Sequence, residues 1–254
     1  MVKFTDSHCH LDFADFDQSR PTLIHQLTQS GIGRIIIPGV SAKHWQRQLD
    51  TCGSFSGCYF GFGIHPWWIN NARQDDLTKL ERYLSTKSRV VALGEIGLDA
   101  HIDDMDKQIR FFEQQLSLAN TLALPVLIHH RQTHHLIIPI LKQMRLTHGG
   151  VIHAFSGSYQ QAKQYLGLGF KLGIGGVITY ERAKKTRHAV AKLPLDSLVL
   201  ETDAPSMPLQ GQQGQANSPT NVVKVFQHLC DLREEPPTKI AAQIEQNCEQ
   251  LFTF

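Results

Sequence analysis

The sequence has no long hydrophobic run, no large excess of one charge and no regular set of cysteines. Its five cysteines include no Cys-x-x-Cys pair, which argues against a disulfide framework or a zinc knuckle and indicates a reducing compartment. The longest segment without Lys, Arg, Asp or Glu, residues 51–72, is interrupted by glycines, His65 and Pro66 and does not predict a membrane span. The N-terminus carries no apolar signal segment. We therefore expect a cytoplasmic protein without membrane contact.

Charge is nearly balanced, with 25 Lys and Arg against 23 Asp and Glu in 254 residues and a formal net charge of +2. Such a balance excludes a global basic field, so any contact with nucleic acid would need a local patch. Hydrophobic residues make up 41% of the chain and charged residues 19%, which is typical of a globular protein with an ample core. Composition predicts no obligate protein partner.

Eight short apolar segments recur along the chain and predict strands. They are rich in β-branched and aromatic residues and too continuous to be one-sided, as in strands buried on both faces of a parallel sheet. The segments are residues 2–4, 34–38, 58–64, 89–93, 125–128, 150–152, 170–174 and 197–200.

Helical patterns lie between these segments. Over residues 106–123, Ile109, Phe112 and Leu116 recur at spacings of three and four, with Asp106 as the expected N-cap. Further helices are expected within 77–84, 132–145, 180–192, 218–229 and 240–252, the last of which would close the bottom or side of the fold. Eight strands alternating with helices predict an α/β fold, a single-domain (β/α)8 TIM barrel over residues 1–254. A doubly wound open sheet is the alternative, but no Gly-x-Gly-x-x-Gly follows the first segment.

Ionisable side chains follow five of the eight apolar segments. They are His8 and His10, Glu95, His129 and His130, His153, and Asp203. In a barrel the carboxyl ends of all strands meet at one mouth, so these residues should converge. Each residue alone has an ordinary structural explanation, such as a hydrogen-bonded core histidine. Burying so many ionisable groups together without a cation would be very unfavourable, however, so the set predicts a metal centre.

The number of candidate ligands exceeds what one ion needs. The natural division places His8, His10 and Asp203 on one cation, His153 with one of the two neighbouring histidines on a second, and Glu95 between them. Two-metal sites of this kind generate a nucleophilic hydroxide at neutral pH. Mixed histidine and carboxylate ligation favours two divalent cations such as Zn or Mn, with Mg as an alternative.

The same residues carry a resemblance to the TatD family of metal-dependent nucleases and hydrolases, closest to its YjjV-like branch. The matching segments span the chain in the family's order and are residues 6–12 (Asp-Ser-His-Cys-His-Leu-Asp), 61–66, 94–99, 125–131, 153–157 and 201–205. The branch is indicated by residues 131–134 and 203–209. Glu95 stands where the phosphotriesterase-like barrels have a carbamylated lysine, which separates this chain from them.

The resemblance implies roles that spacing alone leaves open. It makes His129 the ligand and places His130 at a variable position. It implies that Arg131 contacts a substrate phosphate, for which its planar donor fork is suited, although a surface salt bridge is the ordinary alternative. It also makes His65 a substrate-binding residue, with packing at a helix start as the alternative. Gln132 departs from the acidic residue common in the family at that position, a difference that bears on the substrate and not on the metal ligands.

The predicted function is therefore divalent-metal-dependent hydrolysis, with phosphodiester bonds of DNA or another nucleic acid as the leading substrate. Asp203 would accept or orient a proton, and Glu95 would act between the cations. The alternatives are hydrolysis of a carboxyl ester, lactone or amide, and a metal-binding protein without catalysis. Two further features of the sequence each allow two interpretations. The basic residues Arg182, Lys184, Lys185 and Arg187 are either a nucleic-acid track or a solvated helix face, and loop 206–217 is either a flexible connection or a substrate-facing lid.

Overall fold

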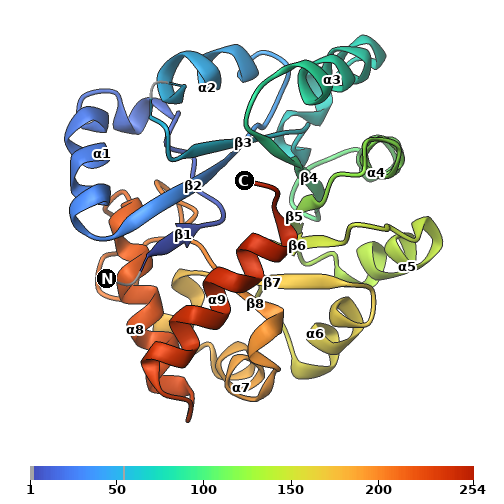
Figure 1. Cartoon of the computed structure of the whole chain (residues 1–254). Helices are drawn as coiled ribbons and strands as arrows, with labels where there is room; N and C mark the ends of the chain where they lie inside the picture. The colour runs from blue at the N-terminus through green and yellow to red at the C-terminus, as the bar shows by residue number, and fades with distance from the viewer. Residues whose placement is uncertain (1–2, 54) are drawn as a thin grey trace.

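The computed structural model describes residues 3–53 and 55–254, and within them eight parallel strands follow one another around a barrel in chain order (Figure 1). The strands are β1 (Phe4–Asp6), β2 (Ile32–Pro38), β3 (Cys58–Phe62), β4 (Val90–Asp99), β5 (Val126–Arg131), β6 (Gly150–Ile152), β7 (Phe170–Ile174) and β8 (Leu198–Leu200). Each strand pairs with the next in parallel register. The predicted (β/α)8 barrel is confirmed, and only Val2 of the first expected strand lies outside the described residues.

The barrel closes between β8 and β1 through hydrogen bonds just beyond the ends of both strands. The Ser7 N–H donates to the Leu200 carbonyl at 2.9 Å, and the Asp203 N–H donates to the His8 carbonyl at 2.8 Å. The first and last segments of the sheet therefore lie side by side at the carboxyl end of the barrel.

Helices surround the strands. They are α1 (Arg20–Gln29), α2 (Trp45–Cys52), α3 (Gln74–Thr86), α4 (Met105–Leu122), α5 (His134–Met144), α6 (Tyr159–Leu166), α7 (Lys184–Lys192), α8 (Val222–Leu232) and α9 (Pro237–Leu251). The expected helix at 106–123 is α4, but its N-cap is Asp104, whose side chain accepts from the Lys107 N–H. The sequence patterns did not predict α1, α2 or α6. In the described part of the chain, no helix combines the length and apolar character needed to span a bilayer.

Helix α9 closes one end of the barrel, as its amphipathic pattern predicted. Cys248 and Phe252 are fully buried and pack against Ile36, Val91 and Leu127, which point into the barrel interior from three different strands. Figure 1 is viewed from this side, with α9 (red) crossing in front of the strands and the C-terminus near the centre of the ring. The opposite end, where the strands have their carboxyl termini, is left open for a site.

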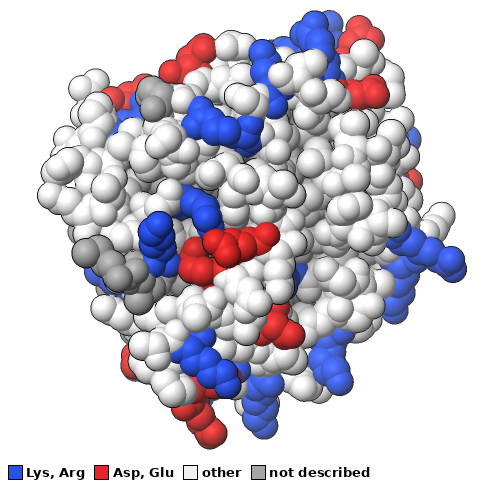
Figure 2. All heavy atoms as spheres, viewed as in Figure 1, with Lys and Arg blue, Asp and Glu red and all other residues white. Residues whose placement is uncertain are grey.

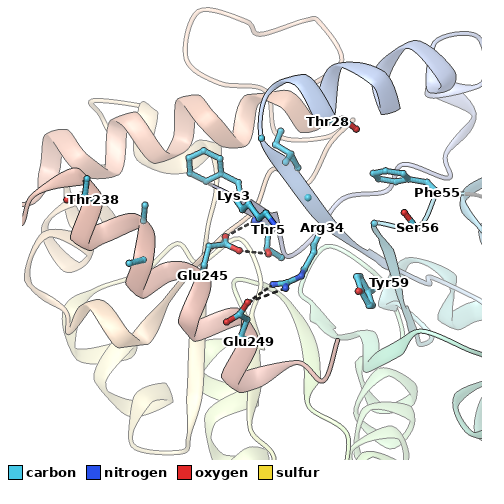
Figure 3. A pocket seen from close by; sticks show the side chains of 17 residues that line it. Lys3, Thr5, Thr28, Arg34, Phe55, Ser56, Tyr59, Thr238, Glu245 and Glu249 are labelled. Atoms are coloured by element: carbon cyan, nitrogen blue, oxygen red, sulfur yellow. Dashed lines mark hydrogen bonds and ion pairs between the residues drawn. The ribbon is translucent and has the colours of Figure 1, made fainter. Parts of the chain in front are cut away.

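A groove of about 810 Å³ lies beside α9 on the closed end (Figure 3). Glu245 accepts hydrogen bonds from the Thr5 N–H at 2.7 Å and the Thr5 hydroxyl at 2.8 Å, while Arg34 contacts Glu249 at 3.1 Å. The Arg34 guanidinium also lies 4.4 Å from the centroid of the Phe254 ring. Figure 2 shows side chains of both signs close together near the middle of this face, with much uncharged surface around them. These pairs attach α9 to β1 and β2.

Candidate metal centre

His8 and His10 lie beyond the first strand. Strand β1 ends at Asp6, so the alternation of side chains along a strand does not bring the two rings together. Backbone hydrogen bonds fix the segment instead, because the Cys9 N–H donates to the Ile36 carbonyl at 3.1 Å and the His10 N–H donates to the Ala204 carbonyl at 2.8 Å. Cys9 is fully buried in the core. The two imidazoles reach the same carboxylates from this irregular segment.

Four side-chain atoms form the first cluster. The Nε2 atom of His8 lies 3.1 Å from Glu95 Oε2 and 3.7 Å from Asp203 Oδ1, and the Nε2 atom of His10 lies 3.5 Å from each of the same oxygens. Nitrogen and oxygen ligands held about 2.0–2.1 Å from a tetrahedral zinc ion are about 3.3 Å apart. The spacing and chemistry of these atoms therefore fit a small divalent cation between them.

Glu95 faces a second cluster with its other oxygen. Glu95 Oε1 lies 3.2 Å from His129 Nδ1 and 3.4 Å from His65 Nε2. The two oxygens of this carboxylate thus face two different groups of imidazoles, which is the arrangement expected of a ligand shared between two cations. Its side chain is almost completely buried on β4, so it has no alternative hydration.

The local backbone is strained where the candidate ligands leave the strands. Asp203 and Ala154, which follows His153, both adopt left-handed conformations, with φ of 57° and 45°. Such a conformation costs a non-glycine residue about 1–3 kcal/mol, and residues held in it are enriched at functional sites. Gly97 lies in the same region, at a position that has no room for a side chain. A Cβ there would lie 2.0 Å from the carbonyl oxygen of His129. Its missing side chain lets β4 approach β5 closely.

The electrostatics of the first cluster depend on a positive charge at its centre. Burial raises the pKa of Glu95, but the surrounding histidines outweigh it and hold that pKa well below the usual value. Burial alone would lower the pKa of His10, yet its contacts with Asp203 and Glu95 raise it to about 10. The carboxylates are therefore ionised, and either a protonated imidazole or a cation must balance them.

Two further carboxylates orient the candidate ligands from behind. Asp99 Oδ2 lies 3.1 Å from His129 Nε2, on the far side of the ring from Glu95. Glu201 Oε1 lies 2.9 Å from His153 Nδ1 and leaves the Nε2 atom of His153 at 3.5 Å from Asp203 Oδ1. Carboxylates in this position fix the ring orientation and the tautomer of a ligating histidine. Both residues lie in segments that resemble the family, and each ends or directly follows a strand, but the sequence does not predict their roles.

The position of His153 bears on how the ligands would divide between cations. Its ring stacks on His8 with centroids 3.5 Å apart, so it lies beside the first cluster. The described short contacts place His65, and not His153, with His129 around Glu95 Oε1. The assignment of His153 to a second cation stays a prediction.

Asp99 supports a testable prediction, because it holds His129 without facing the centre of the site. Replacing Asp99 with asparagine should weaken metal binding or activity by about 10- to 100-fold, as removal of such orienting partners usually does. A calorimetric titration of the protein with the metal measures the metal affinity. Asp103→Asn, an exposed residue in the next loop, is the matched control. Equal affinity in the two variants would contradict the orienting role.

His65 caps a short helix at the edge of the second cluster. Its Nδ1 atom accepts a hydrogen bond from the Trp67 N–H at 3.0 Å, which caps the short helix η2 (Pro66–Asn71). Burial lowers its pKa to about 4, so the ring is neutral, and with Nδ1 accepting, Nε2 carries the hydrogen. The Nε2 atom lies 3.4 Å from Glu95 Oε1, and the side chain lines the pocket. The capping role expected as the alternative is therefore present, and the role of His65 in substrate binding stays a prediction.

The remaining residues singled out from the sequence occupy different surroundings. Arg131 is exposed at the end of β5, lines the same pocket as His65, and forms no ion pair within the described chain. His130 is buried, and its ring packs against His134 at 4.3 Å between centroids. In the basic run, Arg187 donates to the Ile178 carbonyl, Arg182 lies over the Tyr180 ring at 5.0 Å, and two lysines are exposed. Its interpretation as a track for nucleic acid stays a prediction.

The loop after β8 begins at the pocket. Ser206 and Met207 line it, together with the metal cluster. The buried Asn217 holds the other end of the loop, because its Nδ2 donates to the Thr202 carbonyl at 2.8 Å and to the Met207 carbonyl at 3.2 Å. The loop therefore contributes its first residues to the site and is fixed at both ends.

Comparison with known proteins identifies relatives over nearly the whole chain. The profile of the family described as TatD related DNase matches residues 5–253. The chain is 43% identical over 255 residues to a metal-dependent hydrolase of Escherichia coli (strain K12) named YjjV, covering 99% of this chain and 98% of that protein. The crystal structure of E. coli YjjV superposes with a TM-score of 0.96 at 42% identity and covers 100% of this chain and 99% of that one. A protein of Cronobacter sakazakii named 3'-5' ssDNA/RNA exonuclease TatD is 28% identical, with 97% of each chain covered.

Proposed function

Because the chain belongs to the TatD family of metal-dependent hydrolases, we propose that it hydrolyses phosphodiester bonds in nucleic acid at the open end of its barrel. The residues proposed to hold the divalent cations are His8, His10, Glu95, His129, His153 and Asp203. The observation that carries the proposal is the position of Glu95, whose two oxygens face two separate groups of imidazoles. The name of the Cronobacter relative supports nucleic acid as the substrate.

The pocket also offers donors suited to a phosphate. Arg131 presents an uncommitted guanidinium, whose planar fork matches two phosphate oxygens. His65 lies in the same pocket and presents the Nε2–H of a neutral ring. A phosphodiester held by these two residues would place its phosphorus near the Glu95 carboxylate, because His65 Nε2 is 3.4 Å from Glu95 Oε1. The pocket volume of about 420 Å³ accommodates one nucleotide.

The catalytic roles follow from what each side chain can do. Divalent cations, when bound, supply a nucleophilic hydroxide at neutral pH and neutralise charge on the phosphoryl oxygens. Asp203 lies at the edge of the pocket, with Oδ1 within 3.7 Å of three imidazole nitrogens, and is placed to accept the proton of the attacking water. Glu95 holds the two groups of ligands at a fixed separation. His65 and Arg131 orient the phosphate for attack.

Metal-dependent release of nucleotides from an end-labelled oligonucleotide tests the proposal. The protein is loaded with Mg, Mn, Zn or Co in parallel, and its metal content is measured on the same sample. We expect turnover with at least one metal and none after chelation. Carboxyl esters, lactones and amides are assayed beside the oligonucleotide. A metal-loaded preparation that hydrolyses one of these and no phosphodiester would contradict the proposed function.

A further inference from the structure

Two tryptophans form the rim of the candidate metal pocket. Trp67 is 55% exposed and Trp68 36%, and among the described residues they are the exposed large hydrophobic side chains. Both follow His65 in η2, and both line the pocket that contains Glu95 and Arg131. Indole rings bury large areas favourably, so two neighbouring exposed indoles at the mouth of a site indicate a surface that a ligand covers.

Both rings are held in fixed orientations. The Trp67 indole N–H donates to Asp99 Oδ2 at 2.8 Å, the same oxygen that orients His129. The Trp68 ring packs against His44 with centroids 4.5 Å apart, and the Nδ1 atom of His44 is hydrogen-bonded to the Ser41 hydroxyl at 2.7 Å. A ligand that stacks on these indoles therefore does not have to order them first, which favours binding.

Trp68 is also the wall of a second hollow, outside the metal pocket. This hollow has a volume of about 370 Å³ and contains the exposed cations Lys43 and Arg73. It includes one carboxylate, Asp76, whose Oδ2 accepts from the Arg73 N–H at 2.9 Å as part of the cap of α3. Its net charge is therefore positive. Trp67 lines only the metal pocket, Trp68 lines both hollows, and the two cations line only the second one.

Two neighbouring indoles followed by two cations suit an unpaired polynucleotide, whose bases can stack on the indoles while a phosphate reaches the cations. Aromatic platforms beside a basic groove are how proteins bind single strands, because each unstacked base has a face to offer and a duplex does not. We propose that Trp67 and Trp68 stack bases of a single-stranded nucleic acid next to the phosphate being cleaved, while Lys43 and Arg73 bind the following phosphate. This inference rests on the proposed phosphodiester hydrolysis and assigns the residues that would bind the nucleotides beside the cleaved bond.

The test compares substrates that differ in length and in whether they carry bases next to the cleaved bond. The metal-loaded protein is assayed with thymidine 5′-phosphate p-nitrophenyl ester, with thymidine oligonucleotides of two to six residues, and with oligonucleotides of the same length that lack the bases next to the cleaved bond. We expect the base-containing oligonucleotides to exceed the abasic ones in kcat/KM by about tenfold or more, as stacking predicts. Trp68→Ala should remove most of this difference and Trp68→Phe should restore much of it.

The cations and the controls separate the two contributions. The double variant Lys43→Ala and Arg73→Ala should reduce the gain of kcat/KM with oligonucleotide length and make that gain less sensitive to salt. Lys142→Ala, an exposed lysine on α5, is the matched control and should behave as the wild type. Thermal melting checks that each variant is folded. A folded Trp68→Ala protein that retains the full preference for bases would overturn the inference. Absence of turnover with every phosphodiester would instead contradict the proposed function, and the inference with it.

Discussion

Replacing Asp203 with asparagine should lower kcat by about 10²- to 10⁴-fold, the usual effect of removing a group that transfers a proton in the reaction. The Asp203 carboxylate has Oδ1 at 3.5 Å from the Nε2 atoms of both His10 and His153. Neighbouring histidines overcome the effect of burial and hold its pKa well below the ordinary value, so the carboxylate is ionised at neutral pH. Asparagine has nearly the same shape but cannot take up a proton and carries no charge.

Steady-state kinetics and metal analysis together distinguish a catalytic loss from a lost ligand. The variant is assayed at saturating metal, and its metal content is compared with that of the wild type. Asp196→Asn is the matched control, because Asp196 is an exposed acid just before β8 and takes no part in the site. Circular dichroism should show the same barrel in all three proteins. If Asp203→Asn keeps the wild-type kcat, Asp203 does not transfer the proton.

Removing divalent cations should abolish hydrolysis and also lower the melting temperature. A ligand present at a thousand times its dissociation constant stabilises the folded state by about 4 kcal/mol. For a chain of this size, each kcal/mol changes the melting temperature by about 2–4 °C, so we expect a shift of about 8–16 °C on removal. Without a cation, the buried carboxylates must be balanced by protonated imidazoles, of which His10, with its pKa raised to about 10, is the clearest.

Differential scanning fluorimetry before and after dialysis against a chelator measures this shift, and readdition of single metals identifies which one restores it. Because a metal must displace the proton from His10, its apparent affinity should fall as the pH is lowered. A protein freed of metal that keeps both its activity and its melting temperature would contradict a metal-dependent site at these residues.

The barrel and the convergence of its candidate ligands could be predicted from the sequence, because buried parallel strands leave continuous apolar segments and their ends meet at one mouth. Helix α1 was missed for a physical reason, since its buried face includes Arg20 beside Leu23 and Leu27. The Arg20 guanidinium donates to the carbonyl of Leu11 at 2.8 Å and contacts Asp17 at 2.7 Å, so a charged residue occupies a core position. Hydrophobic periodicity cannot identify such a helix.

The roles of Asp99 and Glu201 in orienting the histidines could not be predicted from the sequence, for a different reason. The role of Asp99 depends on which nitrogen of His129 faces Glu95, and that is decided by the pairing of β4 with β5, where Gly97 is opposite His129 and Asp99 opposite Arg131. The register of the two strands follows from the packing of the whole barrel and leaves no local pattern. The exposure of Trp68 is likewise a property of the folded surface, because the sequence around a tryptophan at this position is equally compatible with a place in the core.

The divided contacts of Glu95 make the two imidazole clusters thermodynamically dependent on each other. If both clusters held a cation, Glu95 would be a ligand shared by the two, and a cation at one carboxylate oxygen would change the charge and the rotamer that the other oxygen offers. Linkage requires the effect to be equal in the opposite direction. A substitution at Glu95 would therefore alter the metal affinity of both clusters together, and selection for a particular metal would act on the pair as one unit.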